Sequence, residues 1–159
     1  MRVAAHRQDS FNGRFCQLLH LCLGAKARRI KSGELEKAIE DALAASHGAG
    51  DWVLALDDPN IYLNRELARQ RRTPLSAVEK VALQAALTVE GIKTGYTQTQ
   101  LLAGLPAEAA HGIGVMRSFA PERSGDLVLV PQEHCFWGKY GEKPVGSTHG
   151  SPHRYDAHV

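Results

Sequence analysis

Residues 147–159 read STHGSPHRYDAHV, and they hold three of the eight histidines of the chain together with one aspartate. Neutral imidazole and carboxylate are the usual zinc ligands in proteins. His149 and His153 stand four residues apart, a spacing that lets two histidines share a metal on one helical face. Gly150 and Pro152 lie between them and break a helix, so the stretch is expected to turn. The residues therefore predict either one metal ligand on a tight turn, with partner ligands elsewhere in the fold, or a histidine-rich loop in solvent.

The composition indicates one globular domain. The chain has 159 residues, 43% hydrophobic and 23% charged, which is enough for one hydrophobic core. Its three cysteines have no spacing that predicts a disulfide framework or a CxxC zinc knuckle. No apolar run approaches the roughly 20 residues of a transmembrane helix.

Charge is distributed unevenly along the chain. Residues 1–31 carry seven Lys or Arg and one Asp, a net charge of +6, whereas residues 32–159 carry twelve basic and sixteen acidic residues, a net charge of −4. A basic head of this kind is typical of an arm that binds nucleic acid, or of a segment that does not belong to the fold.

The apolar pattern of residues 32–63 predicts a helix followed by two short strands. Apolar side chains recur at helical spacing from Leu35 to Leu43, and Ser32 is a suitable N-cap in front of them. Glycines at 48 and 50 end this helix. The strands are expected at residues 52–56 and 61–63, with a turn at 57–60.

A second helix–strand pair is predicted before residue 98. Ser76 and Glu79 have the spacing of a capping box, Gly91 ends the helix that they start, and residues 92–97 form a strand. A shorter helix opens at Asn64, and its arginines indicate a solvated face more strongly than a phosphate or nucleic-acid site; they are Arg65, Arg69, Arg71 and Arg72. The segment therefore predicts helices on one face of a small sheet.

The last predicted strand is residues 127–130, LVLV, which is apolar throughout. Such a strand is expected at the centre of a sheet, with both faces covered and with parallel neighbours. A helix is expected before it at residues 108–118, and a loop after it at residues 132–147. If its neighbours lay outside this chain, its open edges would promote self-association.

Several phrases of the sequence resemble the PafA-like, phosphate-irrepressible branch of the bacterial alkaline phosphatases, in the superfamily that also holds the type I phosphodiesterases and nucleotide pyrophosphatases. The resemblance covers about four fifths of the chain, starting near residue 30. Its most specific phrase is THGSP with YDAHV, at residues 148–152 and 155–159. The other phrases are DDPNIYLN at 57–64, YTQTQL at 96–101 and SFAPERSGD at 118–126.

The resemblance implies an α/β fold and a division of the chain into three parts. Residues 1–29 are unmatched, basic and expected to be disordered. Residues 30–105 correspond to an α+β cap insertion beside the active-site mouth. Residues 106–159 correspond to part of the core, with one strand that leads to the metal-binding histidine loop and with the rest of the core missing.

The resemblance also implies a site residue and a cofactor. The family binds two zinc ions, and the histidine before its Gly-Ser pair ligates one of them, which corresponds to His149. Asp156 and His158 correspond to residues that hold the turn, and His153 is expected to face solvent. No residue corresponds to the family's nucleophile or to its other metal ligands. We therefore expect no catalytic residue and no cofactor-binding residue in this chain.

The function expected from these residues is that of a partial chain of a zinc-dependent phosphoric ester hydrolase, inactive alone. Its substrate in the intact enzyme would be a phosphate ester, with monoester and diester both open, and the family is typically periplasmic or secreted. Two alternatives stay open: a binding module that reuses the cap fold, and a basic-headed nucleic-acid binder, of which the second is the weaker.

Overall fold

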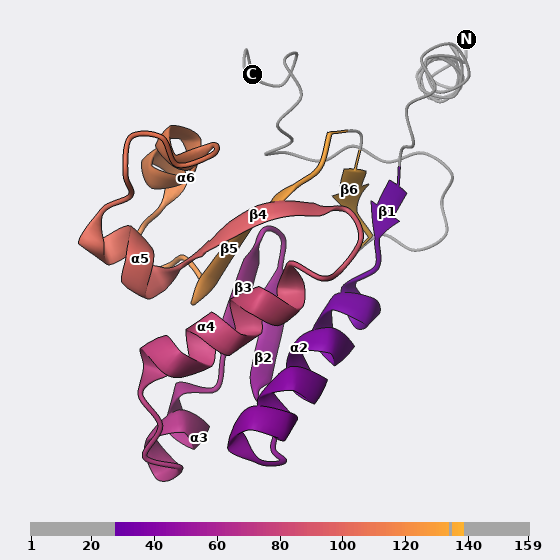
Figure 1. Cartoon of the computed structure of the whole chain (residues 1–159), viewed down its shortest axis with the longest axis vertical. Coiled ribbons are helices and arrows are strands. Elements are labelled where there is room, and N and C mark those ends of the chain that lie inside the picture. Colours follow the sequence, from indigo (N-terminus) through magenta and orange to yellow (C-terminus); the bar gives the residue numbers. More distant parts are fainter. Residues whose placement is uncertain (1–27, 134, 139–159) are drawn as a thin grey trace, which may run out of the picture.

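A computed structural model describes residues 28–133 and 135–138 of the chain (Figure 1). Helices and strands alternate along it in a mixed α/β arrangement. Their order is β1 (Arg28–Ile30), α2 (Ser32–His47), β2 (Val53–Asp57), β3 (Asn60–Leu63), α3 (Arg65–Gln70), α4 (Leu75–Ala86), β4 (Ile92–Thr97), α5 (Gln98–Ala103), α6 (Gly112–Ser118), β5 (Leu127–Pro131) and β6 (Cys135–Trp137).

Four strands form one sheet in the order β2-β3-β5-β4, and every neighbouring pair is antiparallel. β5, the last of these strands along the chain, lies between β3 and β4. Its Leu127 pairs with Ile61 of β3, and its Leu129 pairs with Gly95 of β4. The predicted central position of this strand is therefore confirmed.

The predicted parallel neighbours of residues 127–130 are wrong. An apolar strand shows only that both faces are covered, not the direction of its neighbours, and here the antiparallel neighbours come from residues 60–97 of the same chain. Both edges of β5 are paired, so this strand is not the open template on which the expectation of self-association rested.

Helices cover β5 on both faces. On one face, α2 and α4 pack over the sheet and enclose the larger core, to which β5 contributes Leu127 and Leu129 (Figure 1). The alternate residues Val128 and Val130 belong to a smaller core on the opposite face, closed by residues of α5 and α6. The alternation explains why every residue of this strand is apolar.

The helices follow the predicted apolar stripes but not the predicted caps. Leu35, Ile39 and Leu43 are buried along α2, as expected, yet its N-cap is Lys31 and no side chain caps it. α4 begins at Leu75, directly after its N-cap Pro74, and Pro74 likewise provides no side-chain cap. The predicted capping box is therefore wrong: Ser76 lies inside the helix, and Glu79 is buried.

Two elements differ from the prediction around the second core. α5 was not predicted, although its cap is well formed: the Thr97 hydroxyl accepts from the Gln100 amide, and the Gln100 side chain accepts from the Thr97 amide. α6 is shorter than the helix predicted at residues 108–118 and begins only at Gly112. Residues 107–111 form turns instead, and His111, which has a φ of 59° in the left-handed region, interrupts the helical backbone directly before Gly112.

The first and last described strands pair with each other. β1 and β6 form a two-stranded parallel sheet in which Arg28 pairs with Cys135 and Ile30 with Trp137. β6 corrects the predicted loop at residues 135–137, and β1 gives Arg28 and Arg29 strand structure where disorder was expected; residues 139–147 of the predicted loop lie outside the described residues. Arg29 also lies over the Phe136 ring, 4.6 Å from its centroid. The prediction of disorder for residues 1–27 lies outside the described residues.

Candidate functional site

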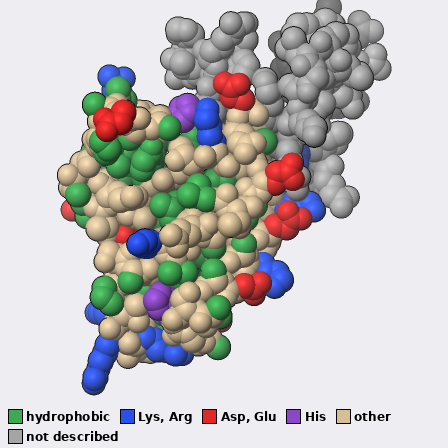
Figure 2. Space-filling model, in the orientation of Figure 1, with side chains coloured by type: hydrophobic (Ala, Val, Ile, Leu, Met, Phe, Trp, Pro, Cys, Tyr) green, Lys and Arg blue, Asp and Glu red, His purple; other side chains and the backbone are tan. Residues whose placement is uncertain are grey.

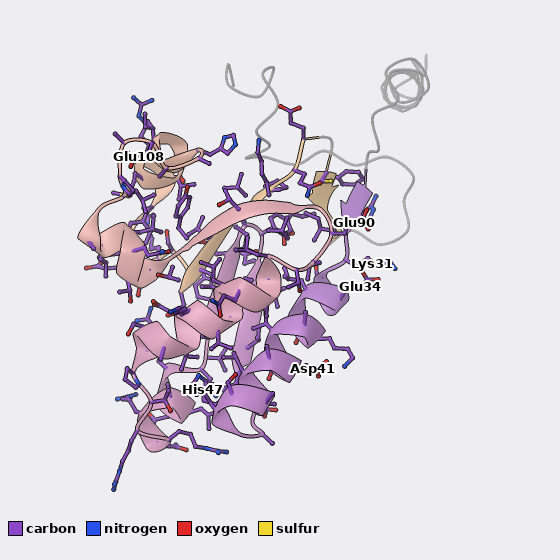
Figure 3. All side chains as sticks on the ribbon, viewed as in Figure 1. Lys31, Glu34, Asp41, His47, Glu90 and Glu108 are labelled. Atoms are coloured by element: carbon purple, nitrogen blue, oxygen red, sulfur yellow. The ribbon has the colours of Figure 1, made fainter. Side chains whose placement is uncertain are left out.

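The predicted metal ligand His149 lies outside the described residues, as do His153, Asp156 and His158. Within residues 28–133 and 135–138, no group of three or more His, Cys, Asp or Glu side chains could hold a metal ion. Figure 3 shows the dispersion: labelled acids and His47 are spread along α2, and Glu108 lies apart beside α6. The described part of the chain therefore does not fit a zinc site by itself.

Three buried polar side chains and the half-exposed Arg65 meet where β3, β4 and β5 reach the same end of the sheet. We call Arg65, Glu79, Gln98 and Asp126 the Asp126 cluster. Asp126 is 2% exposed and directly precedes β5. Its Oδ2 accepts a 2.7 Å hydrogen bond from the Leu63 amide, and its Oδ1 accepts a 2.8 Å hydrogen bond from Arg65 Nε. One carboxylate thus joins the start of β5 to the β3–α3 junction.

Arg65 extends the cluster to the next strand. Its Nη2 donates to Gln98 Oε1 at 2.6 Å, and Gln98 Nε2 donates to the Pro121 carbonyl at 3.0 Å. The Gln98 amide also donates to the Asp126 carbonyl at 2.7 Å. The cluster therefore connects α3, the β4–α5 corner and the segment before β5 through charge-assisted and neutral hydrogen bonds.

The segment of residues 118–126 packs against β3. Gly125 lies against β3, where an added Cβ would be 2.5 Å from the Ile61 carbonyl oxygen, so a side chain cannot fit without moving the backbone. Its amide donates to Asn60 Oδ1 at 3.0 Å, and the Tyr62 hydroxyl donates to the Arg123 carbonyl at 2.8 Å. The phrase is thus a docking segment for β5.

Glu79 enters the cluster from α4. It is 1% exposed; its Oε2 accepts from the Thr99 amide at 3.3 Å, and its Oε1 has no hydrogen-bond partner. Burial raises the pKa of this carboxyl above 4.5, hydrogen bonds from Thr99 and Thr97 oppose the rise, and the nearby Asp126 charge adds to it.

The geometry of the Asp126 cluster suits a structural role, in which it holds neighbouring elements together, rather than catalysis. Both oxygens of Asp126 are occupied by donors, and neither acid is accessible to a substrate because both are at least 98% buried. Sequence reasoning missed the cluster because its members are up to 61 residues apart. The available signals were an acid just before an apolar strand and an acid beside the apolar stripe of α4.

The arginines near α3 are engaged in structural contacts. Arg69 pairs with Glu66 in the same helix, and Arg65 binds Asp126. Arg71 donates to the carbonyl of Ala49 at 2.7 Å, beside the C-terminus of α2. Figure 2 shows blue side chains near the end of the molecule where α3 lies, and the contacts above give Arg65, Arg69 and Arg71 structural partners. Among the described residues, no helix is long and apolar enough to cross a membrane.

Comparison with solved structures places this arrangement in a known fold class: the mixed α/β structure is similar to that of alkaline phosphatases. The crystal structure of wild-type alkaline phosphatase PafA matches with a TM-score of 0.63 and 13% identity, over 79% of this chain and 23% of that chain. A PafA variant with four substitutions matches with a TM-score of 0.55 and 16% identity, over 67% of this chain and 20% of that one.

Sequence comparison gives a further similar protein. A protein of Myroides odoratus named calcium-transporting ATPase is 24% identical over 125 residues, which are 79% of this chain and 22% of that protein. No family model matches the chain. The chain therefore spans less than a quarter of the length of these relatives, and the likeness establishes its fold.

Proposed function

We propose that the chain is part of a zinc-dependent phosphoric ester hydrolase of the alkaline phosphatase type and is inactive alone. The observation that carries this proposal is the likeness of fold to alkaline phosphatase PafA, which extends over 79% of the chain. In this proposal the nucleophile and most metal ligands belong to the three quarters of such an enzyme that this chain does not match, and the substrate is a phosphate ester.

We propose that residues 30–105 correspond to the cap insertion, and that β5 completes the same sheet before the chain enters the proposed core. His149 is our proposed zinc ligand, contributed by residues beyond β6.

The experiment that tests this proposal transplants residues 30–159 into alkaline phosphatase PafA in place of the region that they match. We expect the chimera to hydrolyse p-nitrophenyl phosphate. His149→Ala in the chimera should lower both activity and bound zinc, the activity by at least about 10²-fold, as losses at metal sites usually do. His153→Ala is the matched control and should change both little.

Two further measurements complete the test. The isolated chain should not hydrolyse p-nitrophenyl phosphate, and zinc-stimulated turnover above that of its own His149→Ala variant would contradict the proposal of inactivity. A chimera that is folded by circular dichroism, but in which the His149 and His153 variants behave alike, would contradict the role of His149. A bis-p-nitrophenyl phosphate assay of the active chimera would separate diester from monoester preference.

A further inference from the structure

Glu79 is a buried acid that the proposed function does not use. It lies on α4, 1% exposed, and its Oε1 has no hydrogen-bond partner while its Oε2 holds the Thr99 amide at 3.3 Å. Burying an ionised carboxylate without full hydrogen bonding is costly, whereas a neutral carboxylic acid is tolerated far better. The buried position of Glu79 therefore favours its neutral form over its ionised form.

The charged groups around Glu79 do not neutralise it. On the side of β5 it faces Asp126, whose charge is already paired with Arg65 from α3. The residues of α5 carry no charge, and β4 contributes only the exposed Lys93. On α2, Glu40 is engaged with the Val53 amide at 2.6 Å, and His47 lies at the far C-terminal end of the helix. No cation is thus paired with Glu79 in the described structure.

We propose that Glu79 is a pH-sensitive latch between α4 and the β4–α5 corner. In its neutral form it stays seated against Thr97 and Thr99 and holds α5 against α4. When it loses its proton, the buried charge favours a loosened corner in which the carboxylate reaches water. Because α5 carries Leu101 of the smaller core, this loosening would reach the covering of β5.

The direction of the pH dependence follows from linkage. The pKa of Glu79 in the folded chain is raised above 4.5, so between 4.5 and the raised pKa the folded chain binds more protons than the unfolded chain. Stability is therefore highest below this window, falls as pH rises through it, and stays lower above it. Each pKa unit of the rise lowers the folded-to-unfolded ratio about tenfold.

The test compares the full chain with its Glu79→Gln variant, which keeps the size of the side chain but cannot ionise. In urea unfolding at pH 5 and pH 8, we expect the folded-to-unfolded ratio of the wild-type chain to fall as pH rises, and to fall by more than that of Glu79→Gln. Hydrogen exchange at the Thr99 and Gln100 amides, corrected for intrinsic rates, should accelerate over the same range only in the wild-type chain. Glu108→Gln, at an exposed position, should retain the wild-type pH profile.

A carbon-13 titration of the side-chain carboxyl of Glu79 in the wild-type chain needs no variant to fold. A midpoint above 4.5 that coincides with the loss of stability is the expected result. A midpoint at or below 4.5, or equal pH profiles for the wild-type chain and Glu79→Gln, would overturn the proposal.

Discussion

At the scale of single residues, Asp126 shows how one buried acid fixes the position of a strand. Its carboxylate accepts from the Leu63 amide and from Arg65, so it holds the start of β5 against the end of β3. Gly125, beside it, allows the backbone to approach Ile61 closely. Together the two residues favour the observed register of β5 in the sheet.

We expect Asp126→Asn to destabilise the fold by about 2–4 kcal/mol, because the new amide group offers only one acceptor oxygen to two donors, one of them the buried Leu63 amide, and removes the charge opposite Arg65. Urea unfolding monitored by tryptophan fluorescence would measure the change. Arg69→Gln is the matched control: it removes an exposed pair with Glu66 and should cost less than about 1 kcal/mol. Equal effects of the two substitutions would show that the buried position of Asp126 has no special weight.

At the scale of elements, caps and short corners decide where the helices begin. Asn64 caps α3 through its side-chain oxygen, which accepts from the Leu67 amide at 2.9 Å, as its position before the helix predicted. Its side-chain amide also donates to the Asp51 carbonyl at 2.9 Å, which ties α3 to the residues before β2. One side chain thus serves a helix and a neighbouring turn.

The two bonds of Asn64 can be separated experimentally. Asn64→Asp keeps the acceptor for Leu67 but loses the donor to Asp51, whereas Asn64→Ala loses both. We expect Asn64→Ala to cost about 1–2 kcal/mol of unfolding free energy and Asn64→Asp to cost less, since aspartate is an equally good N-cap. Thermal unfolding of the three chains would measure this order, and an aspartate variant as unstable as the alanine variant would show that the cap contributes little.

At the scale of the whole molecule, the sheet joins residues that are far apart in sequence into one layer. β5 closes the gap between β3 and β4, so the hairpin of residues 53–63 and the strand of residues 92–97 become parts of a single sheet only when β5 is in place. The larger core on one face and the smaller core on the other share this strand. Its insertion is therefore the step that couples the two cores.

We expect hydrogen exchange to be slowest at the amides of β5, because this strand is paired on both edges and covered on both faces. The amides of residues 107–111, which form turns and are mostly exposed, should exchange much faster. Mass spectrometry of overlapping peptides would measure both regions. Fast exchange across Leu127–Pro131 would contradict the central position of β5. It would instead support the prediction of a strand with unpaired edges that promotes self-association.

The sequence alone indicated the main helices, the strands of the larger sheet and the fold class of this protein. Apolar patterns located α2, α4 and the four strands of the larger sheet. The phrases shared with the alkaline phosphatases predicted a mixed α/β fold similar to that of PafA, which the structural comparison confirms. These features are readable because each depends on neighbours within a few residues.

Only the tertiary structure decided the direction of the neighbours of β5, the pairing of β1 with β6, and the Asp126 cluster. Each of these depends on contacts between residues dozens of positions apart, such as Arg65 and Asp126, and no local pattern records which distant partner a buried acid will meet. Glu79 illustrates the point: its spacing from Ser76 suggested a cap at the helix surface, but packing against the β4–α5 corner buried it. The role of His149 stays a prediction, because a metal site is made by ligands brought together from separate parts of a fold.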